Sequence, residues 1–194
     1  MRLPRIAALL LLLPVAAAAQ PHPDPDWPCV QRYVPEIGAA ALWPEAPGGD
    51  WQDDPGVAAL VGRIAPRPVE AEQGLAAIRD FAAPLDAAAR RRLLPLAFRG
   101  VLEETNRQRD AVIDQIRRYA RRQHDLAGRV RELEAALRAA PPPAREELEQ
   151  RRFFAAKTYA DAERMLRYAC EVPVRLEGRL GAYARAMQAA MPQG

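Results

Sequence analysis

The feature that most constrains the fold is an apolar seam that recurs every three or four residues through the centre of the chain. Its average step of about 3.5 residues is the spacing of a coiled coil. A helix that carries this seam is roughly 65 Å long at 1.5 Å per residue. Such a helix needs another helix beside it to bury the seam. No strand pattern follows the first residues of the chain, so we expect an all-α fold. The seam consists of Phe98, Leu102, Thr105, Arg109, Val112, Ile116, Tyr119, Gln123, Leu126, Val130, Leu133 and Leu137.

A forced turn after the seam predicts a long antiparallel helical hairpin. Three consecutive prolines, Pro141-Pro142-Pro143, interrupt the helical pattern, which then resumes with a stripe rich in alanine. Two long helices joined by a short turn pack antiparallel, so we expect a coiled-coil-like hairpin over 96–139 and 144–172. Proline removes a backbone donor and crowds the preceding turn. Pro173 is therefore expected to kink or restart the chain, with a separate C-terminal helix over 174–190.

Two shorter helices are expected before the hairpin. Asp54-Pro55 combines a helix cap with a proline at the first helical position, and predicts a short helix to about residue 65. A second short helix is expected over 69–83. Pro95 should kink the following helical pattern or divide it into a short and a long piece. The helical domain as a whole is predicted to span 55–194.

The segment before these helices has a different composition. Residues 20–54 contain seven prolines and all three tryptophans, Trp27, Trp43 and Trp51, without a sustained helical period. We therefore expect an irregular N-terminal arm. A tryptophan buries a large apolar area with one side chain, so burial against the helices is the first expectation for all three, with stacking on a ligand as the alternative.

The start of the chain has the pattern of a secretory leader. Arg2 and Arg5 precede an apolar stretch that ends at Ala17-Ala18-Ala19, a small-residue cleavage pattern. We predict a signal peptide over 1–19 and export to the periplasm. The first cysteine, Cys29, lies ten residues beyond the predicted cut, which does not fit a lipoprotein.

The cysteine count predicts a disulfide. Cys29 and Cys170 are the two cysteines of the chain, and an even pair in an exported protein is typical of a structural bridge. This bridge would tie the arm to the returning helix. A redox or metal pair is the alternative, but the chain has no C-x-x-C motif and neither histidine lies near a cysteine in the sequence.

Charge and motifs argue against several function classes. The formal charge of +3 includes the two leader arginines, so the processed chain is almost neutral and nucleic acid is not an expected partner. No later apolar segment predicts stable membrane insertion. The sequence also lacks a nucleophile elbow, a phosphate-binding glycine loop, an H-E-x-x-H zinc motif and a haem-attachment motif. We expect no enzyme activity, no cofactor and no metal site.

These observations favour a non-enzymatic periplasmic protein that acts through protein–protein interaction. It would be either an adaptor for one partner or a chaperone-like protein for unfolded clients, with a homo-oligomer as a further expectation. Thr105, Arg109 and Gln123 interrupt the apolar seam, and either fix its register or mark a docking site. Together with the three tryptophans, they form the candidate interaction surface. The alternative is a small-molecule or metal-ion binding module with a groove between the arm and the helices.

Overall fold

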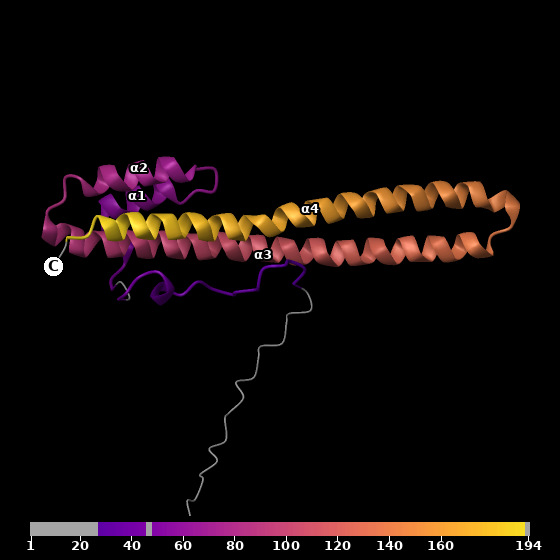
Figure 1. Ribbon diagram of the computed structural model, residues 1–194, viewed down its shortest axis with the longest axis horizontal. Coiled ribbons are helices and arrows are strands. Elements are labelled where there is room, and N and C mark those ends of the chain that lie inside the picture. Colours follow the sequence, from indigo (N-terminus) through magenta and orange to yellow (C-terminus); the bar gives the residue numbers. More distant parts are fainter. Residues whose placement is uncertain (1–26, 46–47, 193–194) are drawn as a thin grey trace, which may run out of the picture.

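The computed structural model describes residues 27–45 and 48–192, and these residues form an elongated, helical molecule (Figure 1). Its helices are α1 (Pro55–Ile64), α2 (Ala71–Ala82), α3 (Ala87–Ala139) and α4 (Pro142–Ala189), with short 3₁₀ turns η1 (Ala39–Ala41) and η2 (Trp51–Asp53) in the arm. The described part of the chain contains no strand. The predicted all-α class is therefore confirmed, whereas the predicted signal peptide over 1–19 lies outside the described residues.

Two long helices dominate the fold. α3 has 53 residues, a length of about 80 Å at 1.5 Å per residue, and α4 returns beside it after a turn at Ala140 and Pro141. The predicted long antiparallel hairpin is thus present, and Figure 1 shows that it forms the whole length of the molecule. The predicted seam faces inward, since each of its twelve side chains is buried or half-buried.

The helix boundaries differ from the prediction at two prolines. α3 begins at Ala87 and includes Pro95, whereas α4 continues through Pro173 to Ala189. The predicted division at Pro95 and the separate helix over 174–190 are therefore wrong. A proline inside a helix costs roughly 3 kcal/mol. Here Pro173 is buried and Pro95 is followed by buried Ala97 and Phe98, so tertiary packing offsets the lost hydrogen bond.

The core lies at the end of the hairpin that contains the C-terminus. α1 and α2 pack on this end of α3 and α4, as Figure 1 shows. Buried residues of all four helices form one cluster, which includes Ile64, Ile78, Phe98 and Met187. Asp54 caps α1 by accepting hydrogen bonds from the backbone N–H groups of Gly56 and Val57, as its sequence position predicts. We call this four-helix end the proximal body.

One contact in the proximal body leaves no room for a side chain. A Cβ atom on Gly74 of α2 would lie 1.8 Å from the hydroxyl oxygen of Tyr183 on α4. Tyr183 is completely buried, and its hydroxyl has no hydrogen-bond partner among the described residues. Burial raises the pKa of the Tyr183 hydroxyl, and the positive charge of Arg179 opposes this increase. The glycine therefore allows α2 and α4 to approach closely.

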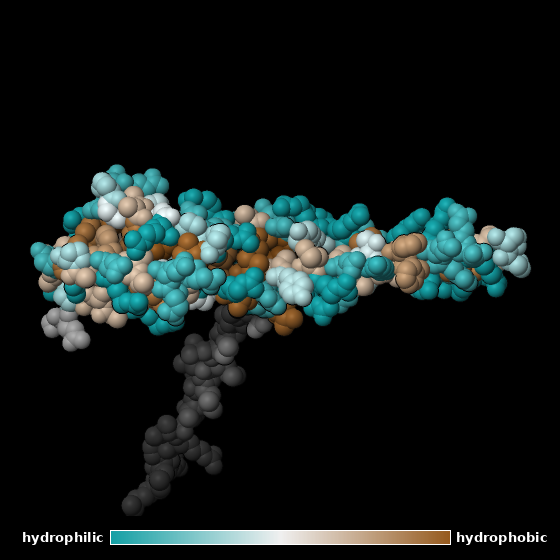
Figure 2. Space-filling view, turned by 90° about the horizontal axis from the view of Figure 1, so that it is seen from above, coloured by the Kyte–Doolittle hydropathy of each residue, from teal (hydrophilic) through white to brown (hydrophobic). Residues whose placement is uncertain are grey.

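The other end of the hairpin has no such core. We call residues 121–165 the distal hairpin. Leu133 is its single buried residue, whereas the remaining apolar side chains of its seam are half-buried. Figure 1 shows that α1 and α2 lie at the opposite end and that the described arm borders only the beginning of the distal hairpin, so the rest of it consists of two helices alone. In the view of Figure 2, hydrophobic surface concentrates over the proximal body and the middle of the hairpin.

None of the helices among residues 27–45 and 48–192 combines the length and apolarity that crossing a membrane requires.

Candidate functional site

The arm lies along the hairpin and is held by one covalent bond. A disulfide joins Cys29 of the arm to Cys170 of α4, with the Cα atoms 5.6 Å apart, which confirms the predicted pairing. Beside it, the side chain of Gln31 donates a hydrogen bond to the backbone carbonyl of Cys170. From this point the arm runs toward the proximal body, antiparallel to α3 and parallel to α4. The arm is therefore an integral layer of the protein.

Arg109 of α3 holds the middle of the arm. Its side chain is only 2% exposed and donates hydrogen bonds to the carbonyls of Val34 (2.8 Å) and Pro35 (3.5 Å). The same guanidinium donates to Glu177 of α4 at 2.9 Å. The fork geometry of arginine allows one side chain to bind three acceptors in this way. One buried side chain thus joins α3, α4 and the arm.

Other helix side chains bind the backbone of the arm. Asn106 accepts from the N–H of Ile37 at 3.1 Å and donates to its carbonyl at 3.0 Å. Gln188 donates to the carbonyl of Leu42 at 2.7 Å, and Arg99 donates to the carbonyl of Gly49 at 2.6 Å. Outside its short 3₁₀ turns, the arm has few backbone hydrogen bonds within itself, and unpaired backbone groups away from water are costly. The helices therefore supply the polar partners that the arm lacks.

The three tryptophans are placed against the hairpin. Trp43 is 6% exposed and stacks on Phe98 with the ring centroids 4.9 Å apart. The indole N–H of Trp51, which is half-buried, donates to Glu103 at 2.8 Å. Trp27 is also half-buried, donates to the carbonyl of Gln31, and lies 5.2 Å from the ring of Tyr33. Their contacts are with this chain, and each fixes a different part of the arm.

The polar residues of the seam do not form one site. Thr105 and Arg109 are buried next to the arm. Gln123 lies about 20 Å further along α3 by helical rise and is half-buried. The sequence therefore identified the residues that interrupt the seam. Only the structure shows that Thr105 and Arg109 pack inside the molecule, whereas Gln123 borders two open grooves.

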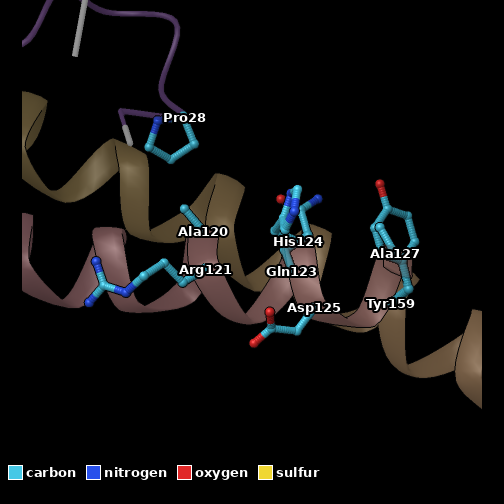
Figure 3. Close-up of a pocket in the computed structure, with 8 residues that line it drawn as sticks. All are labelled: Pro28, Ala120, Arg121, Gln123, His124, Asp125, Ala127 and Tyr159. Atoms are coloured by element: carbon cyan, nitrogen blue, oxygen red, sulfur yellow. The ribbon is translucent and has the colours of Figure 1, made fainter. Parts of the chain in front are cut away.

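Two grooves flank the point where the arm meets the hairpin. One has a volume of about 720 Å³, and Pro28, Gln123, His124 and Tyr159 belong to its lining. In Figure 3 the charged ends of Arg121 and Asp125 point away from His124, and among the described residues His124 has no hydrogen-bond partner. Within the same part of the chain, no group of histidine, cysteine and carboxylate side chains could hold a metal ion. This groove brings no acid–base pair together.

The second groove borders the disulfide. Its volume is about 760 Å³, and Val30 and Gln31 of the arm lie opposite Leu166 and Val174 of α4. Val30 is fully exposed and Val174 is 51% exposed. The groove therefore has apolar walls, with charged side chains of α4 at its rim.

Four large apolar side chains are exposed on the distal hairpin and its border. Phe153, Phe154, Met165 and Tyr168 of α4 have exposed fractions of 59%, 63%, 54% and 64%, and the two phenylalanine rings contact each other edge to face at 5.5 Å. Sequence analysis missed these residues because they lie off the stripe that faces α3. The adjacent phenylalanines were the available signal, since two consecutive side chains cannot both face the seam. Large apolar side chains that gather on an exposed face favour an interaction site.

Loss of the disulfide should release one end of the arm. In the chain-entropy model, a loop closed over 141 residues stabilises the fold by about 5 kcal/mol at most. We expect Cys29→Ser with Cys170→Ser to lower the free energy of unfolding toward that limit and to leave the arm bound at Ile37, whose N–H donates to Asn106. Chemical denaturation measures the first effect, and amide hydrogen exchange at Ile37 measures the second. Val30→Ser should change neither. Fast exchange at Ile37 in the double variant would contradict the expectation.

Comparison with protein-family models, curated proteins and solved structures finds no match to this chain. The fold and the surfaces described above therefore carry the argument about function.

Proposed function

We propose that this chain is a non-enzymatic periplasmic protein that binds another protein through its distal hairpin. The observation that carries the proposal is the exposed apolar face of α4, formed by Phe153, Phe154, Met165 and Tyr168, on a two-helix extension with a single buried residue. Two helices that bury so little of their seam gain stability when a further helix packs on them. A protein partner supplies that layer.

The location in the periplasm has two supports. The Cys29–Cys170 disulfide is typical of an oxidising compartment outside the cytoplasm. The leader-like pattern over 1–19 agrees with export through a cleavable signal peptide.

The charges of the distal part of α4 favour a protein over a membrane or a nucleic acid. Residues 145–168 carry six basic and five acidic side chains, and most of them pair along the helix, as in Arg151 with Glu147 and Arg164 with Asp161. Binding to anionic lipids or phosphates requires an excess of positive charge on one face. The balanced pattern instead suits another protein surface with charges of both signs.

The size of the apolar face favours an adaptor over a chaperone-like protein. A protein that holds unfolded clients needs broad, adaptable apolar surface. Here the four exposed apolar side chains form two groups with charged side chains between them, so the apolar surface is small and divided. We therefore propose a folded partner with a helical docking surface.

A photoreactive amino acid at position 154 tests this proposal in living cells. We expect it to capture one dominant protein, identified by mass spectrometry, because Phe154 is the more exposed of the two phenylalanines on this face. The matched control places the same group at Glu132, which is exposed on α3 of the distal hairpin. Equal capture from both positions, or many different captured proteins at position 154, would disprove an adaptor.

A second candidate is the binding of a small apolar molecule in the groove beside the disulfide. The groove of about 760 Å³ has the size of a small-molecule site, and Val30 and Val174 expose their side chains there. Binding would displace water from both side chains. Addition of an aliphatic compound should shift the amide resonances of Val30 and Val174. In Val174→Glu, the same compound should leave the Val30 resonance unchanged.

A further inference from the structure

We infer that the first partner of the distal hairpin is a second copy of this chain, bound antiparallel along α4. The inference rests on the proposed function, because it names the occupant of the same surface. The surface is a stripe of exposed residues with alternating steps of three and four, which we call the outer stripe: Phe154, Lys157, Asp161, Arg164 and Tyr168. This is the spacing with which one helix packs along another.

The charges of the outer stripe complement themselves about one point. Lys157 and Asp161 lie at equal distances from Tyr159 along α4. A two-fold axis at the level of Tyr159 therefore places Lys157 of each copy opposite Asp161 of the other. Lys157 has no ion-pair partner among the described residues, and the carboxylate of Asp161 can accept from Lys157 of the second copy as well as from Arg164. Two reciprocal ion pairs result.

The same axis gives Phe154 of the outer stripe a partner. It places Phe154 opposite Arg164 of the second copy, where a guanidinium can lie on the aromatic ring. Phe153 and Met165 flank the outer stripe on opposite edges, so they border this interface without facing each other. Each contact occurs twice, since a two-fold interface uses the same surface on both copies.

Other arrangements of two copies are disfavoured by charge. A parallel pair in register would place Lys157 on Lys157 and Asp161 on Asp161. An antiparallel pair centred on Asp161 would bring two carboxylates together at the axis. Like charges in contact oppose association. The outer stripe therefore selects the antiparallel alignment about Tyr159, which puts the two proximal bodies at opposite ends of a rod.

The single lysine of the chain gives a direct test. Lys157 is the chain's only lysine, so a lysine–lysine crosslink between two peptides that contain it must join two copies. In the inferred pair, the two Lys157 residues are offset by four residues along the helix axis, and the two helices are separated by a typical interhelical distance. Together these place the two Cα atoms about 11 Å apart. We expect a short amine-reactive crosslinker to yield this product from the full exported chain, and light scattering to show a dimer with a dissociation constant on the order of 10 µM.

Charge reversal tests the alignment. Lys157→Asp alone and Asp161→Lys alone should each weaken the dimer roughly tenfold or more, because like charges then meet twice. The combined exchange of both residues should restore it, since opposite charges face again. Reversal of the exposed pair Arg129 and Glu132 on α3 is the matched control and should have no effect.

The outcomes separate this inference from the proposed function. A purified chain that stays monomeric at 200 µM, or a combined exchange that fails to restore the dimer, would overturn the antiparallel copy. If position 154 then captures one different protein in cells, the proposed function stands without it. If the purified chain is a dimer that the combined exchange restores, and position 154 captures the chain itself, the second copy is supported; capture of nothing besides the chain would disprove the adaptor.

Discussion

Arg109→Ala should lower the free energy of unfolding by about 3 kcal/mol and loosen the arm near Val34. The substitution removes a buried guanidinium that binds Val34 and Pro35 of the arm and Glu177 of α4. It also leaves a cavity between three segments, which adds to the cost. Because Glu177 is 44% exposed, water can solvate its carboxylate, so the loss is smaller than for a fully buried pair.

Denaturant unfolding and hydrogen exchange measure these two effects. Arg107→Ala is the matched control, because Arg107 lies two residues away, is 66% exposed and pairs with Glu104 on the surface. Its removal should change stability by less than about 0.5 kcal/mol. If both variants were equally stable, Arg109 would not be the residue that joins the arm to the hairpin.

Gly74→Ala should destabilise the protein by at least about 3 kcal/mol. The new Cβ atom would lie 1.8 Å from the Tyr183 hydroxyl oxygen and 2.2 Å from its ring, and Tyr183 is buried so that the ring has no space to move. α2 must then separate from α4. The better helix propensity of alanine, about 1 kcal/mol, offsets only part of this cost. Thermal unfolding should show a decrease in Tm on the order of 10 °C.

Two further variants make this expectation specific. Gly62→Ala changes a helical glycine with no atom within 4 Å of the added Cβ, and should stabilise the protein by about 0.5 to 1 kcal/mol. Tyr183→Leu removes the clashing ring and should recover part of the stability of Gly74→Ala. An unchanged Tm in Gly74→Ala would show that α2 and α4 do not pack as closely as described.

The candidate site was only partly predictable from sequence. The tryptophans and polar seam residues could be named in advance, and Cys29 and Cys170 could be paired because there were only two. The contacts of Arg109 could not, since its acceptors are 74 and 75 residues away along the chain. The exposed face around Phe154 was missed for a different reason. Hydrophobic residues are expected in the interior, and a periodic pattern identifies those that form the buried seam. It does not identify hydrophobic residues on the exposed face of the same helix.

The sequence by itself determined the helical class, the hairpin and the disulfide, because helical period, a triple proline and a single cysteine pair are local or countable signals. Only the tertiary structure decided that α3 and α4 continue through Pro95 and Pro173, since the packing of distant segments offsets a local cost. It also decided that the arm covers the middle of the hairpin and leaves the distal hairpin uncovered. These outcomes depend on which surfaces meet in space, which no local pattern encodes.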